Sequence, residues 1–359
     1  MMTVLGRYLA REIVGATFTV LLAFLGLFAF FDFLNELDSV GKGGYELHHA
    51  LLYVAMILPG RVYELLPIAV LIGTLYSLTT LARHSEITVM RASGMSTAKM
   101  LRVLAGIGTI FVVATFIFGE YVAPPAERAA QQWRLTATNS TVSSQLRSGL
   151  WVKDGPRFVN VRTLQPDRSM EKVRIFEFDE HHALRSVTEA AAGRYLADED
   201  SWRLNGIRQT RFLGDRTEVV DLPEMDWKSE LTPEVLSVLM VLPERMSVAT
   251  LVAYVNHLRE NQQNSDRYEI ALWKKLIYPF AALVMMALAL PFAMSHERMG
   301  GVSVKVFLGV MLGVGFHLLN GLFSNLGVIN SWPPVLAAST PSLLFVVAAA
   351  GLLFWVERR

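Results

Sequence analysis

The chain has 359 residues, of which 52% are hydrophobic and only 18% are charged, and its 33 basic and 32 acidic residues nearly cancel. A soluble globular protein usually carries about a quarter charged residues. Residues 123–270 hold 41 of the 65 charges. This pattern excludes one soluble domain or a disordered chain, and it predicts a membrane protein with one water-soluble insert. The small net charge argues against nucleic-acid binding, and the absence of Cys excludes disulfides and Cys-type zinc sites.

Six apolar segments are long enough to cross a membrane as helices. A span through ~30 Å of hydrocarbon needs about 20 mostly apolar residues. Four runs without charges approach or reach this length: 13–31, 65–82, 103–119 and 276–295. The uncharged run 306–356 is long enough for two spans, divided at Trp332-Pro333-Pro334. We therefore predict three spans on each side of the insert.

The first two spans need a closer definition. The first run exceeds the hydrophobic region of a signal peptide and has no small-residue cleavage site, so we expect it to remain as a helix. Residues 47–81 exceed one span and contain Pro59 and Pro67. We interpret them as a short interfacial helix up to about residue 58, followed by a span that starts near residue 62.

Basic residues in the short loops predict the orientation, because cytoplasmic loops are rich in Lys and Arg. The opposite short loops hold only Lys42. One side carries Arg7, Arg11, Arg83, Arg91, Lys99, Arg102, Arg298, Lys305, Arg358 and Arg359. We expect cytoplasmic termini and a periplasmic insert in a bacterial inner membrane.

The insert is predicted to be mostly β-structure. After a polar helix or linker at 124–148, short strands are expected at 151–153, 158–161, 173–178, 192–196, 202–212 and 217–222. Asp154-Gly155-Pro156 is a turn signal between the first two. Such a series favours an antiparallel sandwich or jelly roll. A helix over 248–261, with Ser247 as N-cap, leads back to the membrane.

Polar and small residues inside the spans are candidate functional positions. In the fifth span they share one predicted helix stripe, formed by Gly309, Gly313, His317, Asn320 and Ser324. Ordinary helix packing would explain it, and so would hydrogen bonds across an interface or a wet cavity. The first span has a stripe of Gly15, Thr19, Ala23 and Gly26, with Asp32 at its outer end. Asp32 is either a functional charge or a solvated charge at the interface, and we favour the second interpretation. Arg61 and Glu64 are expected to pair locally.

A short cytoplasmic helix is predicted between spans two and three. Ser85 suits its N-cap, Glu86 its positive N-terminal end and Gly94 its end. A capped helix on this surface is suited to docking a separate motor subunit, although a connector without a partner would have the same composition.

The sequence contains no recognisable catalytic constellation. It has no phosphate-binding P-loop, no H-E-x-x-H and no G-x-S-x-G. His181-His182 beside Glu180 is better explained as a solvated hairpin tip. We therefore expect no catalytic residue, no metal site and no cofactor in this chain.

The segments ARHSEITVMRASGMS and GLWVKDGPRFVNV, together with the three-plus-three layout, resemble the LptF/LptG family of lipopolysaccharide-export permeases. The resemblance runs from RYLAREI to the sixth span. It implies six transmembrane helices with an all-β periplasmic jelly-roll domain inserted between helices 3 and 4. The implied regions are 1–122 with a coupling helix at 85–95, then 123–270 and 271–359.

The resemblance also implies a function and partners. Members of the family pair with a paralogous permease and are driven by two copies of the ATPase LptB, which binds ATP and Mg. They extract lipopolysaccharide through a gate between the first and fifth spans and pass it to LptC and LptA. Carried over by position, the coupling residues are Glu86, Ile87, Met90, Arg91 and Gly94. The gate or cavity residues are Gly309, Gly313, His317, Asn320, Ser324, Gly26 and Asp32.

One departure concerns the lipid phosphates. Family members often carry basic residues near the outer end of the first span, but residues 32–38 read DFLNELD here. Lys42, Arg61, the paired permease or divalent cations would then contact the phosphates. Alternative functions are a mechanotransmitting permease for another lipid or lipoprotein, a lipid- or glycan-modifying enzyme, and a non-transport scaffold. The position of the insert disfavours the first, and the lack of paired acids or a metal constellation disfavours the second.

Overall fold

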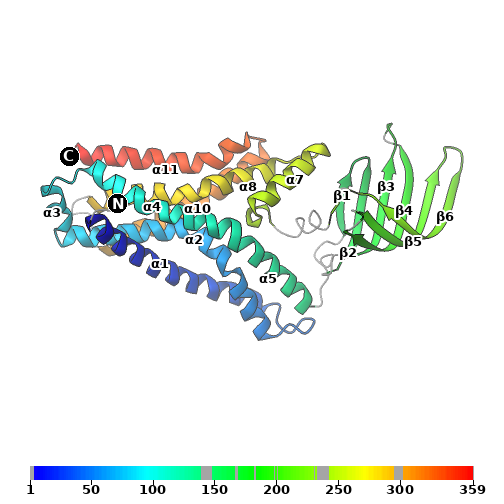
Figure 1. The fold of residues 1–359 in the computed structure, drawn as a ribbon, viewed down its shortest axis with the longest axis horizontal. Helices are drawn as coiled ribbons and strands as arrows, with labels where there is room; N and C mark the ends of the chain where they lie inside the picture. The colour runs from blue at the N-terminus through cyan, green and yellow to red at the C-terminus, as the bar shows by residue number, and fades with distance from the viewer. Residues whose placement is uncertain are drawn as a thin grey trace.

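The computed structural model describes residues 4–138, 148–165, 169–181, 183–197, 199, 201–229, 231–232, 242–294 and 302–358. Within these residues, six helical runs are long and apolar enough to span a membrane, as predicted. They are α1 (Val4–Leu37), α2 (Leu47–Arg83), α4 (Thr97–Ile117) with its continuation, α8 (Asp266–Ile277) with α9 (Ala281–Met294), α10 (Val302–Ile329) and α11 (Pro334–Glu357). The sheet lies at one end of the helical body, while α3 (Glu86–Ala92) and both termini lie at the other (Figure 1).

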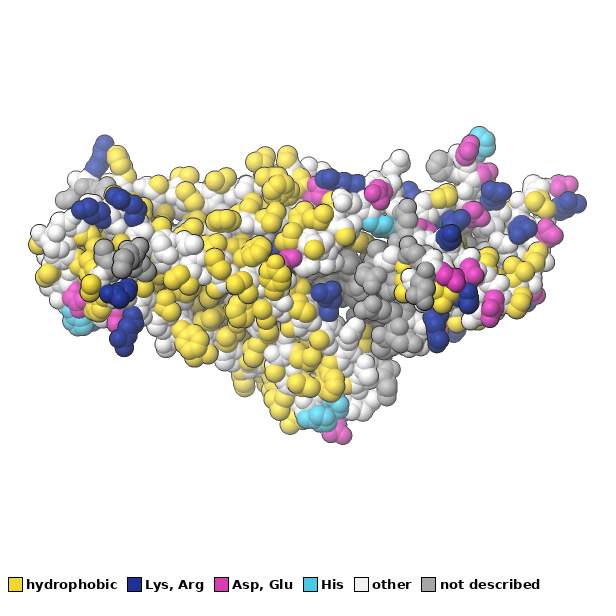
Figure 2. Space-filling model, viewed as in Figure 1, with side chains coloured by type: hydrophobic (Ala, Val, Ile, Leu, Met, Phe, Trp, Pro, Cys, Tyr) yellow, Lys and Arg dark blue, Asp and Glu magenta, His cyan; other side chains and the backbone are white. Residues whose placement is uncertain are grey.

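The second helix is the centre of the membrane body. Within its most apolar stretch 83% of the residues are buried, against 17% in α1 and 22% in α10. Buried residues of α2 belong to three hydrophobic clusters. One is shared with α1, α4 and α9, one with α9, α10 and α11, and one with α5. Hydrophobic side chains cover the middle of the helical body on the visible face, and charged side chains gather toward its ends (Figure 2). This distribution fits a body surrounded by lipid.

The predicted break in the second span is wrong. Residues 47–83 form one continuous helix, with Pro59 and Pro67 inside it. Neighbouring helices can support the backbone groups that a proline leaves unbonded in a membrane helix. Two irregular turns interrupt spans three and four. A π-helical turn, η1 (Phe118–Val122), joins α4 to α5 (Ala123–Ala137), and a 3₁₀ turn, η4 (Tyr278–Phe280), joins α8 to α9.

The insert contains a single antiparallel sheet in the described residues, in the order β1-β2-β3-β4-β5-β6. Its strands are β1 (Leu150–Asp154), β2 (Arg157–Leu164), β3 (Met170–Phe178), β4 (Leu184–Leu196), β5 (Ser201–Phe212) and β6 (Thr217–Trp227). Asp154 pairs with Arg157, so Gly155 and Pro156 form the predicted turn. The inner face packs around Trp202, whose Nε1 donates to the Leu231 carbonyl over 2.6 Å. The all-β insert is confirmed and is consistent with a jelly-roll-like domain.

Helix α7 (Val248–Glu260) connects the insert to the membrane body. Its N-cap is Ser247 as predicted, with the side chain accepting from Thr250 N over 3.2 Å. The Glu120 carboxylate also accepts from Val248 N over 2.7 Å, which joins α7 to the third span. At the other end, the Asn261 side chain accepts from Gly155 N over 2.8 Å. Helix α7 therefore contacts both the membrane helices and the β1–β2 turn.

Some predicted features fall outside the described residues. They include Arg298 and Arg359 of the charge asymmetry, His182 of the hairpin tip, and the part of the predicted linker at 139–147. The rest of the tip is a turn as expected, because Asp179 N donates to the Ala183 carbonyl over 2.9 Å and His181 is exposed.

Candidate functional site

The short helix α3 is anchored to the membrane body by its apolar face. Ile87 and Met90 are each only 6% exposed and belong to the cluster that contains Leu9 and Ile13 of α1. Glu86 is half-buried, and its Oε2 accepts from the Tyr8 hydroxyl of α1 over 2.9 Å. The sequence offered these three residues as partner contacts. In the structure Ile87 and Met90 pack into a cluster shared with α1, α2 and α4, with α3 lying mainly against α2, and Glu86 bonds to α1.

The ends of α3 differ in how well they were predicted. The helix begins after Ser85, but this residue has a left-handed φ of 60° and its side chain makes no capping hydrogen bond, so the expected side-chain cap is wrong. The predicted end is confirmed. Gly94 has a φ of 92°, its N donates to the Arg91 carbonyl, and Met95 N donates to the Met90 carbonyl. These are the two bonds of a Schellman motif.

The outer surface of α3 is a small apolar and basic patch. Val89 is 66% exposed, and Arg91, two positions later, is exposed as well. Arg83 and His84, just before the helix, are also exposed. Val89 was not among the predicted contacts. An exposed apolar residue two positions from Arg91 on a helix whose other face is buried would have identified it.

We predict that Gly94→Val loosens the end of α3. Among the residues that the structure describes, none has an atom within 4 Å of a Cβ built at Gly94, so the penalty comes from the positive φ. Left-handed backbone costs an L-residue about 1–2 kcal/mol. Amide hydrogen exchange across residues 86–95 should therefore accelerate by about 5- to 30-fold. The matched control is Gly106→Val in α4, where a Cβ also meets nothing and φ is ordinary. Equal exchange in both variants would contradict the role of Gly94.

The predicted stripe of α10 divides between two environments. A Cβ at Gly309 would lie 2.7 Å from Leu75, and one at Gly313 would lie 2.6 Å from Ile68, so both glycines allow α10 to approach α2 closely. Asn320 is buried, and its Nδ2 donates to the Phe316 carbonyl of the same helix over 3.1 Å. His317 is instead exposed and Ser324 is half-buried. The stripe therefore packs on α2 at its two glycines and is exposed at His317.

The small residues of α1 face outward. Gly15 and Gly26 have no atom within 4 Å of a built Cβ, and Thr19 is exposed. The buried face of α1 is formed by Leu9, Ile13, Thr17 and Leu21. Sequence reasoning missed the contact that holds this face, because Gly73 of α2 lies directly against Thr17. The signal was a glycine at the end of the apolar run at 65–72.

A charged cluster joins the C-terminal part of α1 to α2. Arg61 contacts Asp32 through two hydrogen bonds, of 2.6 and 2.9 Å, and contacts Glu64 over 2.9 Å. The Asp32 side chain is 12% exposed, so its interpretation as a solvated charge is wrong, whereas the Arg61–Glu64 pair is confirmed. Lys42, the other predicted phosphate contact, is exposed in the loop that follows α1. Arg61 thus has two carboxylate partners already.

We predict that Asp32→Asn weakens the attachment of α1 to α2 by about 2 kcal/mol, below the range for fully buried ion pairs because the cluster is partly exposed. Arg61→Met should have a similar effect, and the double variant should lose less than the sum of the two. Thermal unfolding of the detergent-solubilised chain measures this. Lys42→Ala serves as a control that should leave unfolding unchanged. Additive losses from Asp32→Asn and Arg61→Met would contradict a direct pair.

The sequence is similar to known proteins over nearly its whole length. Residues 7–355 match the family described as Lipopolysaccharide export system permease LptF/LptG. The chain is 30% identical to Lipopolysaccharide export system permease protein LptG of Haemophilus influenzae, covering 100% of this chain and 99% of the relative. It is also 30% identical to LptG of Escherichia coli K12, with 98% of each chain covered. Identity to LptF of Escherichia coli K12 is 20%, over 97% and 94% of the two chains.

Proposed function

The chain belongs to the lipopolysaccharide export system permease LptF/LptG family, and we propose from this premise that it works as the LptG-type half of a permease pair whose other half is LptF. It is a transporter component and not an enzyme, and it is a multi-pass inner-membrane protein. In our proposal the pair extracts lipopolysaccharide from the inner membrane. An LptB dimer that binds ATP and Mg drives it, and LptC and LptA receive the lipid. The higher identity to LptG than to LptF supports this half of the pair.

The proposed orientation places both termini and α3 in the cytoplasm and the sheet in the periplasm. The arrangement in Figure 1 supports it, because α3 and the termini share the end of the body opposite to the sheet. Arg83, Arg91 and Lys99 are all exposed at that end. Their number agrees with the preference of cytoplasmic loops for basic residues.

The proposed coupling element is α3. Its buried face packs into the cluster shared with α1, α2 and α4, and the Glu86–Tyr8 hydrogen bond joins it to α1, so a force on the exposed surface at Val89 would reach the first two spans. Coupling of this kind requires two arrangements of α3 and α1 that the motor binds with different affinity. The observation that carries the proposal is this anchored helix in a chain that matches the family end to end.

The proposed gate uses the uncovered faces of α1 and α10. Both helices pack on α2, and both leave large apolar side chains exposed, such as Phe18 and Leu22 in α1 and Leu318 in α10. Gly15, Gly26 and His317 lie among these exposed positions. We assign them to the surface that meets LptF or the lipid cavity. The opposite side of α10 packs on α2 and so positions the gate; its residues there include Gly309, Gly313 and Asn320.

The experiment that tests the proposal is ATPase activity in nanodiscs of this chain with LptF and LptB, with and without lipopolysaccharide. Wild type should hydrolyse ATP only with both partners and respond to lipopolysaccharide. Glu86→Ala should lower the activity, because it removes the bond between α3 and α1. The control is Glu218→Ala, an exposed carboxylate in β6. Failure to assemble with any ATPase would overturn the permease proposal, and assembly with activity indifferent to lipopolysaccharide would overturn its substrate.

A further inference from the structure

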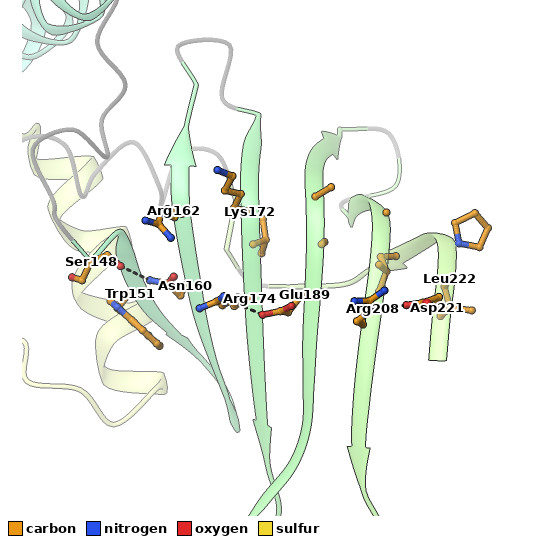
Figure 3. Close-up of a pocket in the computed structure, with 16 residues that line it drawn as sticks. Ser148, Trp151, Asn160, Arg162, Lys172, Arg174, Glu189, Arg208, Asp221 and Leu222 are labelled. Atoms are coloured by element: carbon orange, nitrogen blue, oxygen red, sulfur yellow. Dashed lines mark hydrogen bonds and ion pairs between the residues drawn. The ribbon is translucent and has the colours of Figure 1, made fainter. Parts of the chain in front are cut away.

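A groove of about 820 Å³ crosses the outer face of the sheet, opposite to the packed inner face. One wall is a continuous row of directly paired residues, one from each strand: Trp151, Asn160, Arg174, Glu189, Arg208 and Asp221. Figure 3 shows these side chains lying in line across the strands. Because neighbouring strands are about 4.8 Å apart, the row is about 24 Å long. This length suits a chain of several linked units better than a single ion.

The second wall is a row where the strand pairing is interrupted. Five residues, one from each of β2 to β6, lie at the same level of the sheet, and none of them is paired with its neighbour although the residues on both sides are. They are Arg162, Lys172, Ala191, Gly206 and Pro223. Lys172 and Gly206 have positive φ values of 52° and 63°. A positive φ is unusual for lysine and costs conformational energy. All five residues line the groove.

The charged side chains of the first wall form ion pairs with one another, whereas those of the second wall form none within the described part of the chain. Arg174 contacts Glu189 and Arg208 contacts Asp221, each over 2.9 Å. The hydrogen bond to Asp221 raises the pKa of Arg208 above its ordinary value. On the other wall, Arg162 and Lys172 form no ion pair or hydrogen bond with any side chain in the described ranges.

These two cations also lie directly opposite each other. Arg162 and Lys172 stand between the paired residues Val161–Val173 and Thr163–Glu171 of β2 and β3. Like charges directly opposite on neighbouring strands destabilise a sheet. An anion bound between them would relieve this repulsion, and arginine and lysine are the side chains that usually bind phosphate.

An aromatic side chain closes one end of the groove. Trp151 is 52% exposed, and its ring stacks on Phe176 with the centroids 5.6 Å apart. The stacking fixes the ring, so an apolar face is held beside Asn160 and the charged row. A sugar ring presents both an apolar C–H face and hydroxyl groups, and it suits a site with an aromatic surface and alternating hydrogen-bond donors and acceptors.

We propose that this groove binds the phosphorylated saccharide portion of the glycolipid, with phosphate held between Arg162 and Lys172 and a sugar ring stacked on Trp151. The proposal rests on the function proposed above and names a second contact for the same substrate, outside the membrane and outside the apolar inner face of the sheet. The groove guides the headgroup while the acyl chains follow another path.

The test uses the full-length chain in nanodiscs and lipopolysaccharide from which all acyl chains have been removed. Calorimetry should detect binding to wild type, and Arg162→Gln with Lys172→Gln should weaken it at least tenfold. Trp151→Ala should weaken it as well. Arg185→Gln with Arg216→Gln removes the same charge elsewhere on the domain and should change the affinity less than twofold. The dephosphorylated saccharide should bind wild type as weakly as the phosphorylated saccharide binds the variant with Arg162→Gln and Lys172→Gln. Amide exchange in β2 and β3 of wild type should slow when the phosphorylated saccharide binds.

Three outcomes would overturn the inference. They are no binding to wild type, equal weakening in the groove and control variants, and tighter binding of polyglutamate, which would assign the groove to an acidic peptide. The same preparations separate this inference from the proposed function. If wild type does not bind the saccharide but its ATPase activity still responds to lipopolysaccharide, the groove inference is contradicted and the proposed function is not. Saccharide binding without any lipopolysaccharide response contradicts the proposed transport and leaves the groove in place.

Discussion

Gly73→Val is expected to separate α1 from α2 and to destabilise the membrane body by about 3 kcal/mol, the upper part of the range for overpacked cores. A Cβ at Gly73 would lie 2.6 Å from both N and Cα of Thr17. Backbone atoms cannot rotate away as a side chain can, so one helix must move. Thermal unfolding of the solubilised chain should show a clear loss, and cross-linking between Cys residues introduced at positions 9 and 78 should fall.

The matched controls for Gly73→Val are Gly15→Val and Gly26→Val. Both glycines lie in α1 with open space where a Cβ would be. In the isolated chain these variants should unfold at the wild-type temperature, and if this face meets LptF they should lower the yield of the permease pair. A Gly73→Val chain that unfolds like wild type would show that α1 does not cross α2 at Thr17.

Val89→Asp is expected to weaken binding of the ATPase subunit by about 2 kcal/mol or more, which is roughly 30-fold in affinity. Val89 is the most exposed large apolar side chain of α3, and an interface that buries it would have to desolvate the new carboxylate. Because the side chain is 66% exposed, the substitution should not disturb the fold of the chain alone. Co-purification with LptB and titration of the detergent-solubilised complex measure the loss.

Val219→Asp in β6 is the control for this substitution. Val219 has a similar exposure of 58% and lies in the sheet, at the other end of the molecule (Figure 1). It should leave ATPase binding unchanged. Undiminished binding by Val89→Asp would show that the motor docks elsewhere, and α3 would then be a connector.

The sequence by itself determined the number of spans, the position of the insert and several local ends. These features depend on short-range physics. A bilayer requires about 20 apolar residues per helix, the Gly155-Pro156 turn connects β1 and β2 directly, and Gly94 and Ser247 end or start helices through bonds to residues within a few positions. The continuous α2 was beyond this reasoning, because Pro59 and Pro67 break a helix unless neighbouring helices support it.

Tertiary structure alone decided which residues meet. Hydrophobic periodicity in a membrane helix is weak because all faces are apolar, so it did not separate exposed His317 from buried Asn320. Asp32 and Arg61 are joined only because α1 and α2 cross, and Gly73 is needed only because Thr17 lies against it. In the sheet, the opposition of Arg162 and Lys172 follows from the register of β2 and β3. Each of these contacts joins residues that are distant in the sequence and become neighbours only on folding. The physical reason is that packing depends on how the surfaces of two elements meet, which local sequence patterns do not specify.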